Sequence, residues 1–112
     1  KEYGETVDHY GKDFSSSGHL YLMRVDGIDE KQRNAIIVKM AEKGVATNVH
    51  YKPLPMHTAY KALGFDIKDY PKAYEKYKNE ITLPLHTLLT DEEADYVIES
   101  FKKSVQEVVY AK

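Results

Sequence analysis

Two hydrophobic patterns alternate along this chain. Short apolar runs bounded by turn residues, which are typical of β-strands, occur at His19–Val25, Val45–Tyr51 and Glu80–Leu85. Between and after these runs, apolar residues recur every three or four positions, the spacing of a helix that packs one side against a core. The order predicts a two-layer α+β domain with about three mostly antiparallel strands packed on helices.

The two longest predicted helices have recognisable ends. Asp29 can cap a helix over Glu30–Lys43, and Gly44 supplies the stop. Thr90 can cap the last helix, with Glu93 three residues later completing a capping box. These features predict where both helices begin.

The last helix has the clearest period in the chain. Its apolar stripe predicts a helix that packs with the first one on the same face of the sheet. Shorter helices at His57–Leu63 and Pro71–Lys78 are polar and predicted to be peripheral, and Pro84 is expected at an edge or at the end of its strand. The residues of the stripe are Ala94, Val97, Ile98, Phe101, Val105, Val108 and Val109.

The first part of the chain lacks this periodicity. Residues 1–17 contain two glycines and a run of three serines, and they predict an irregular lead-in or linker. We therefore expect the domain itself to comprise residues 18–112.

Composition excludes several classes of protein. Sixteen basic and 18 acidic residues give a formal charge of −2 without a basic run, so nothing indicates binding to nucleic acid or an anionic membrane surface. No apolar run approaches the roughly 20 residues of a membrane helix, and no cysteine is available for disulfides or thiolate chemistry. Because the five histidines lack metal-site spacing, no metal is expected. The default expectation is a soluble cytoplasmic protein.

Polar chemistry is concentrated in the loop that follows the second predicted strand. His50, Tyr51, Lys52 and His57 lie there, and two prolines stiffen the backbone between them. These four residues are the candidates for substrate binding. Each has a structural alternative: a hydrogen-bonded histidine or tyrosine, a solubilising lysine, or a histidine that flanks a helix start.

Arg24 is a weaker candidate at the end of the first predicted strand. A guanidinium can bind a substrate carboxylate or phosphate through two hydrogen bonds. The alternative is a surface ion pair with a neighbour such as Asp26.

Several ordered segments carry a resemblance to a known family. The segments VATNVHYKPLPMHTAYKALGF, YPKAYEKY and EITLPLHTLLTDEE follow a helix that ends in glycine and precede an amphipathic helix. In this order they resemble the C-terminal small domain of the DegT family of sugar aminotransferases. The resemblance spans roughly residues 17–108 and implies the small domain of a fold type I enzyme that depends on pyridoxal phosphate.

The resemblance also implies an activity. Family members transfer an amino group, as a rule from glutamate, to a nucleotide-linked keto sugar for polysaccharide or glycan precursors, and they act as homodimers. It implies that His50 and Tyr51 contact the phosphates or the sugar. Many members place a histidine where this chain has Pro55, and His57 is the nearest alternative.

The resemblance assigns no catalytic or cofactor-binding residue to this chain. In the family, the Schiff-base lysine, the acid that pairs with the pyridine nitrogen and the phosphate pocket belong to the large domain, and no lysine here matches the Schiff-base context. The fragment alone is therefore expected to be inactive and to close over the active site of the full enzyme. The rival hypothesis is a self-standing α+β module that binds a small ligand or has a regulatory role.

Overall fold

A three-stranded sheet forms the centre of the computed structural model, which describes residues 2–84 and 86–110. Its strands are Gly4–Thr6 (β1), Tyr21–Val25 (β2) and Glu80–Leu83 (β3), arranged in the order β1-β2-β3 with both pairings antiparallel. The predicted fold class and the strands around β2 and β3 are confirmed. Leu85, which the predicted third strand included, lies outside the described residues.

The remaining strand prediction was wrong. Val45–Tyr51 forms no strand and makes one isolated bridge, in which Asn48 exchanges backbone hydrogen bonds with Thr82 at 3.2 and 2.7 Å. Beyond Asn48 the ladder stops because side chains take the next backbone donors: Asn48 Oδ1 accepts from Val49 at 2.8 Å, and a Glu80 carboxylate oxygen accepts from His50 at 2.9 Å.

The third strand instead comes from the segment predicted to be irregular. β1 pairs Gly4 with Val25, so close that a Cβ on Gly4 would stand 1.8 Å from the carbonyl oxygen of Arg24. A side chain at that position would force the strands apart. The domain boundary predicted at residue 17 stays a prediction.

Among the described residues, four α-helices accompany the sheet, together with three short helical turns. The α-helices are Glu30–Glu42 (α1), Thr58–Ala62 (α2), Pro71–Tyr77 (α3) and Asp91–Val105 (α4), and a π-helical turn over Gln106–Tyr110 continues α4. Two 3₁₀ turns, Leu54–Met56 and Ile67–Asp69, flank α2. The bounds of α1, α2 and α3 agree with the predicted helices to within one residue. The helix α4 begins at the predicted cap, but its α-helical part ends at Val105, whereas the predicted apolar stripe continues to Val109.

The helix caps follow from the sequence. Asp29 accepts from the backbone of Gln32 at 2.8 Å, and the Gln32 side chain accepts from the backbone of Asp29 at 3.1 Å, which is a complete capping box. Gly44 ends this helix with φ +78°. At the start of α4, the hydroxyl oxygen of Thr90 accepts from the backbone N–H of Glu93 at 3.1 Å. The Glu93 carboxylate accepts from the Thr90 hydroxyl and not from the Thr90 backbone N–H, so the predicted capping box is only half formed.

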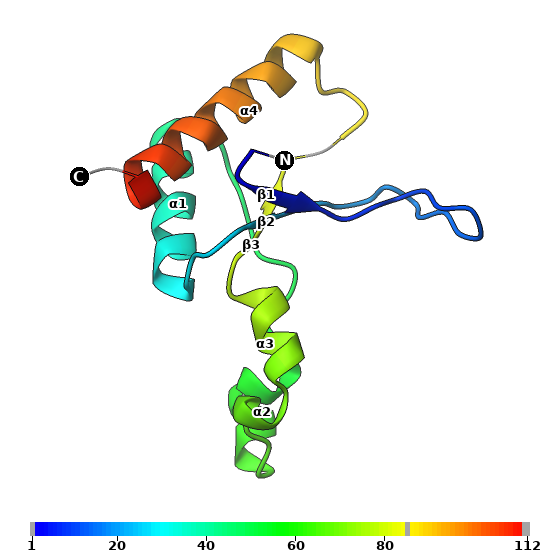
Figure 1. Cartoon of the computed structure of the whole chain (residues 1–112), viewed down its shortest axis with the longest axis vertical. Helices are drawn as coiled ribbons and strands as arrows, with labels where there is room; N and C mark the ends of the chain where they lie inside the picture. The colour runs from blue at the N-terminus through cyan, green and yellow to red at the C-terminus, as the bar shows by residue number, and fades with distance from the viewer. Residues whose placement is uncertain (1, 85, 111–112) are drawn as a thin grey trace.

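The hydrophobic core lies between the sheet and the pair α1 and α4, which pack against each other (Figure 1). The helices α2 and α3 form a separate lobe that extends away from the sheet, and α3 buries only Tyr77. This arrangement confirms the prediction that the first and last helices share a face. The core residues are Met23, Val25, Ile28, Ile36, Met40, Val45, Ile81, Leu83, Val97, Phe101 and Val105.

A hairpin arm, residues 7–18, connects β1 to β2 and projects away from the body (Figure 1). Its own hydrogen bonds close it, from Gly11 N to the Phe14 carbonyl at 2.9 Å and from Ser16 N to the His9 carbonyl at 2.7 Å. Tyr10 and Phe14 are exposed on the arm. The arm contributes nothing to the hydrophobic core.

The core predicts a measurable difference between two positions on α4. Phe101 is 5% exposed and Ile98 is 46% exposed. We expect Phe101→Ala to lower the free energy of unfolding by about 3 to 5 kcal/mol, and Ile98→Ala by roughly 1 kcal/mol. Urea unfolding of the two variants measures this difference. Since both changes introduce alanine into the same helix, equal losses would contradict the packing.

Candidate functional site

The pairing of β2 with β3 separates an apolar face of the sheet from a polar one. Met23 pairs with Ile81, and these side chains lie in the core. Side chains alternate along a strand, so the next pair, Arg24 with Glu80, faces the other way. Thr82 shares that second face, and the loop after α1 crosses it through the bridge at Asn48.

His50 lies on this polar face, held by two residues of β3. Its backbone N–H donates to Glu80 Oε2 at 2.9 Å, and its ring Nδ1 is 2.8 Å from the hydroxyl oxygen of Thr82. The Thr82 hydroxyl donates to Glu80 Oε1 at 2.7 Å. Glu80 and Thr82 are buried, whereas His50 is only half-buried. The three residues form one connected polar network with the imidazole at its outer end.

Tyr51 stands beside this network. Its ring meets that of His50 edge to face, with centroids 4.6 Å apart and planes at 85°, and its side chain is 70% exposed. The peptide bond between the two residues is cis. The pair presents an imidazole and a phenol next to each other at the protein surface.

Lys52 and His57 form a second pair farther along the loop. His57 Nε2 donates to the backbone carbonyl of Lys52 at 3.1 Å, which ties the two ends of the proline-containing turn together. Both side chains are exposed. The structure thus joins the four candidates as two neighbouring pairs. Among these four residues, His50 is the one that hydrogen-bonds to the sheet.

Arg24 is an ion-pair residue in this structure. It binds Glu5 across β1 and β2, with Arg24 Nε 3.0 Å from Glu5 Oε1, and not Asp26. The hydrogen bond from Arg24, and then its positive charge, hold the pKa of Glu5 below its ordinary value of 4.5. The guanidinium therefore already has a carboxylate partner.

Sequence reasoning missed Glu80 and Thr82. Both belong to the apolar-looking run EITL, in which every residue is buried. A polar residue at alternate positions of a buried strand was the available signal, because such residues need partners. Those partners come from a loop about 30 residues earlier, which no local pattern reveals.

No described residue supplies the lysine that a pyridoxal phosphate site requires. Every lysine within residues 2–84 and 86–110 is exposed or half-exposed, and several pair with glutamates, such as Lys43 with Glu107 at 3.1 Å. A Schiff-base lysine works from a desolvated pocket or beside another cation that lowers its pKa. The residues described here therefore do not fit the complete cofactor site.

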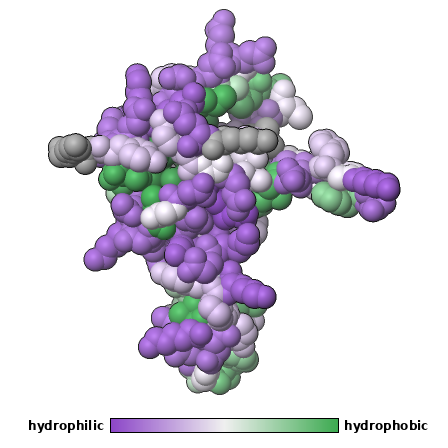
Figure 2. All heavy atoms as spheres, in the orientation of Figure 1, coloured by the Kyte–Doolittle hydropathy of each residue, from purple (hydrophilic) through white to green (hydrophobic). Residues whose placement is uncertain are grey.

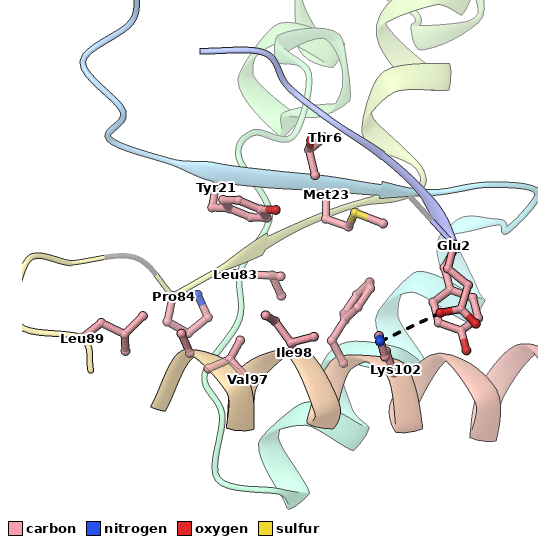
Figure 3. A pocket seen from close by; sticks show the side chains of 13 residues that line it. Glu2, Thr6, Tyr21, Met23, Leu83, Pro84, Leu89, Val97, Ile98 and Lys102 are labelled. Carbon is pink, nitrogen blue, oxygen red and sulfur yellow. Dashed lines mark ion pairs between the residues drawn. The ribbon is translucent and has the colours of Figure 1, made fainter. Parts of the chain in front are cut away.

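An apolar groove of about 350 Å³ lies on the opposite face of the sheet, next to α4 (Figure 3). Met23 and Leu83 point from the strands toward Val97 and Ile98 of the helix. The rim of the groove carries an ion pair between Lys102 and Glu2 at 4.0 Å, which Figure 3 draws as a dashed line. The groove is distinct from the network around His50.

Hydrophilic side chains cover most of the face seen in Figure 2, and apolar ones appear there as small separate patches on the body and on the lobe of α2 and α3. Within the described ranges, no three acidic or histidine side chains are grouped to hold a metal ion. None of the described helices has the length and apolar character needed to cross a membrane.

Comparisons with known proteins define the class to which this fold belongs. The family model for the DegT/DnrJ/EryC1/StrS aminotransferase family matches residues 2–102. The chain belongs to this aminotransferase family, and the resemblance found in the sequence is confirmed.

Solved and curated relatives agree with the family. Spr1654 from Streptococcus pneumoniae, assigned as a sugar aminotransferase and solved in its PMP form and its PLP form, has a TM-score of 0.92 for the PMP form, with 53% identity over 96% of this chain. The spore coat polysaccharide biosynthesis protein SpsC of Bacillus subtilis is 33% identical over 79% of this chain.

A third relative is the UDP-4-amino-4,6-dideoxy-N-acetyl-beta-L-altrosamine transaminase of Helicobacter pylori, which is 29% identical over 81% of this chain. The chain spans 27%, 23% and 24% of the lengths of Spr1654, SpsC and this transaminase. It thus corresponds to about a quarter of each relative.

The ion pair of Glu5 with Arg24 predicts a pH dependence of stability. Because the pKa of Glu5 is lowered in the folded state, its contribution is present above the ordinary value of 4.5 and is lost as the pH falls through the lowered value. We expect Glu5→Gln to lower the melting temperature slightly near pH 7. Below the lowered pKa of Glu5, we expect the variant and the wild type to melt at the same temperature. Melting curves of both proteins from pH 7 to pH 2.5 test this, and a difference that persists at the acid end would contradict it.

Proposed function

We propose that this chain is the C-terminal small domain of a pyridoxal phosphate-dependent aminotransferase that acts on a nucleotide-linked keto sugar. The observation that carries the proposal is the family match over residues 2–102, together with a TM-score of 0.92 to a sugar aminotransferase. Two relatives whose names specify nucleotide sugars, one linked to UDP and one to dTDP, support the substrate class. The relative SpsC supports a role in polysaccharide precursor synthesis.

In this proposal the loop around His50 forms one wall of the substrate site. His50 and Tyr51 contact the phosphates or the sugar, and Lys52 supplies a mobile positive charge for a diphosphate. His57 holds the backbone of Lys52, at 3.1 Å, and lines the same turn. The exposed side chains on a loop anchored by β3 support this role.

The chain contributes binding and closure rather than the transamination chemistry. When bound, pyridoxal phosphate supplies the electron sink, and the protein orients the substrate and excludes water. The absence of a buried lysine among the described residues supports placing the cofactor in the remaining three-quarters of the enzyme. Glutamate as the amino donor, a homodimer and a cytoplasmic location stay predictions.

The ligand role of His50 predicts a change in substrate binding. In the complete enzyme we expect His50→Ala to raise the KM for the nucleotide sugar about 2- to 10-fold, the loss of one hydrogen bond, with a smaller effect on kcat. Steady-state kinetics at saturating amino donor measure this. His19→Ala, which changes an exposed histidine without a partner among the described residues, is the matched control. Unchanged kinetics of the His50 variant would reject the contact.

The division of labour predicts that the 112-residue chain is inactive by itself. Incubated with pyridoxal phosphate and reduced with borohydride, it is expected to show no stoichiometric label on any one lysine and no transamination of a keto sugar. Peptide mass spectrometry of the reduced protein measures the labelling, and the complete enzyme serves as the positive control. One fully labelled lysine would favour a self-standing module over a fragment.

A further inference from the structure

We propose that Thr82 and Glu80 are positioning residues that fix the tautomer of His50, so that its Nε2 accepts a hydrogen bond from a hydroxyl group of the sugar. The inference deepens the proposed function, because it rests on contact between His50 and the substrate. It adds which atom of the ring makes the contact and which kind of ligand group meets it. It also assigns a role to two buried residues that the proposed function leaves unused.

The hydroxyl group of Thr82 has one proton to donate. That proton goes to Glu80 Oε1 at 2.7 Å. The hydroxyl oxygen of Thr82 is 2.8 Å from Nδ1 of His50. Because its proton goes to Glu80, this oxygen can only accept a hydrogen bond from Nδ1. Nδ1 must therefore carry the hydrogen.

Glu80 supports this direction because both of its oxygens act as acceptors. Oε2 receives the backbone N–H of His50 at 2.9 Å, and Oε1 receives the Thr82 hydroxyl. An ionised carboxylate has no proton to give.

With Nδ1 protonated, the neutral ring offers Nε2 as an acceptor. No residue within the described ranges makes a hydrogen bond to Nε2, and the side chain of His50 is only half-buried. A ligand group that meets Nε2 of the neutral ring must therefore donate. A sugar hydroxyl donates, whereas an ionised phosphate oxygen only accepts.

His57 provides an internal contrast. Its Nε2 lies 3.1 Å from the carbonyl oxygen of Lys52, which can only accept, so Nε2 carries the hydrogen in the neutral ring. The two loop histidines thus have opposite tautomers, set by different partners. A change at Thr82 should alter the tautomer of His50 and leave the tautomer of His57 unchanged.

The test uses the complete protein with histidine rings labelled with ¹⁵N and long-range ¹H–¹⁵N spectra above the range in which the imidazole protonates. His50→Gln assigns the signals of His50. We expect a protonated Nδ1 and a bare Nε2 at His50, and the reverse at His57. A neutral His50 with the proton on Nε2 would overturn the proposal.

Two variants of the same residue separate positioning from general structural support. Thr82→Val removes the hydroxyl at nearly constant shape and should give His50 a mixture of tautomers. Thr82→Ser keeps the hydroxyl and should retain the Nδ1–H form, and the His57 signals serve as the control in both. An unchanged His50 signature in Thr82→Val would also overturn the proposal.

Ligand titration then tests the kind of group that meets Nε2. A nucleotide sugar should shift the Nε2 signal of His50, whereas UDP or dTDP alone should leave it in place. A shift with the nucleoside diphosphate alone, together with protonation of the ring, would overturn the assignment to a hydroxyl.

Kinetics distinguish failure of this inference from failure of the proposed function. If the tautomer is as stated but His50→Ala leaves the KM unchanged, then the substrate contact is wrong, and the hydroxyl assignment falls with it. If His50→Ala raises the KM while Nε2 carries the proton in the wild type, then only the tautomer inference is wrong.

Discussion

The antiparallel pairing of β2 with β3 is the constraint on which the rest of this structure depends. All four residues of β3 are buried, but they serve two environments: Ile81 and Leu83 complete the core, and Glu80 and Thr82 receive the loop that carries His50. A slip of one residue in register would exchange the two sets, placing a carboxylate in the core and an isoleucine under the imidazole. The hydrophobic core and the candidate site are thus specified by one alignment.

A second buried group holds α1, α3 and the beginning of β3 together. Arg33 is only 1% exposed, and its Nη1 donates to the carbonyl oxygen of Tyr77 at 2.8 Å. The guanidinium also lies 4.6 Å from the centroid of the Tyr77 ring, whose hydroxyl donates to Glu30 at 2.9 Å. A buried charge is tolerated when it is paired and hydrogen-bonded in this way. Burial raises the pKa of Tyr77, which keeps its hydroxyl a donor.

Patterns that act within a few residues were readable from the sequence. The capping box at Asp29, the stop at Gly44 and the periodic stripe of α4 each depend on neighbours in the chain, and the helices were predicted correctly. The strand predicted at Val45–Tyr51 failed because Glu80 and Asn48 side chains take its backbone donors. β1 was missed because its pairing depends on a close approach of Gly4 to Arg24, and three residues leave little pattern.

The candidate site also contains residues that the sequence predicted and residues that it did not. His50, Tyr51, Lys52 and His57 were found because they are neighbours in sequence within a loop that resembles a known family. Glu80 and Thr82 were not found, because their hydrogen-bond partner His50 is 30 and 32 residues away along the chain.

The long separation between the paired strands has a consequence for how the site comes into existence. Asn79 binds the carbonyl oxygen of Val25 across 54 residues of chain, so β3 joins β2 only after a large loop has closed. Loop closure of this kind governs the rate of folding more than the final stability. The hydrogen bonds that hold His50 likewise require β3 to meet a loop about 30 residues earlier in the chain. Partly unfolded chains therefore contain His50, Thr82 and Glu80 without the hydrogen bonds that join them, and this arrangement forms only with the native fold.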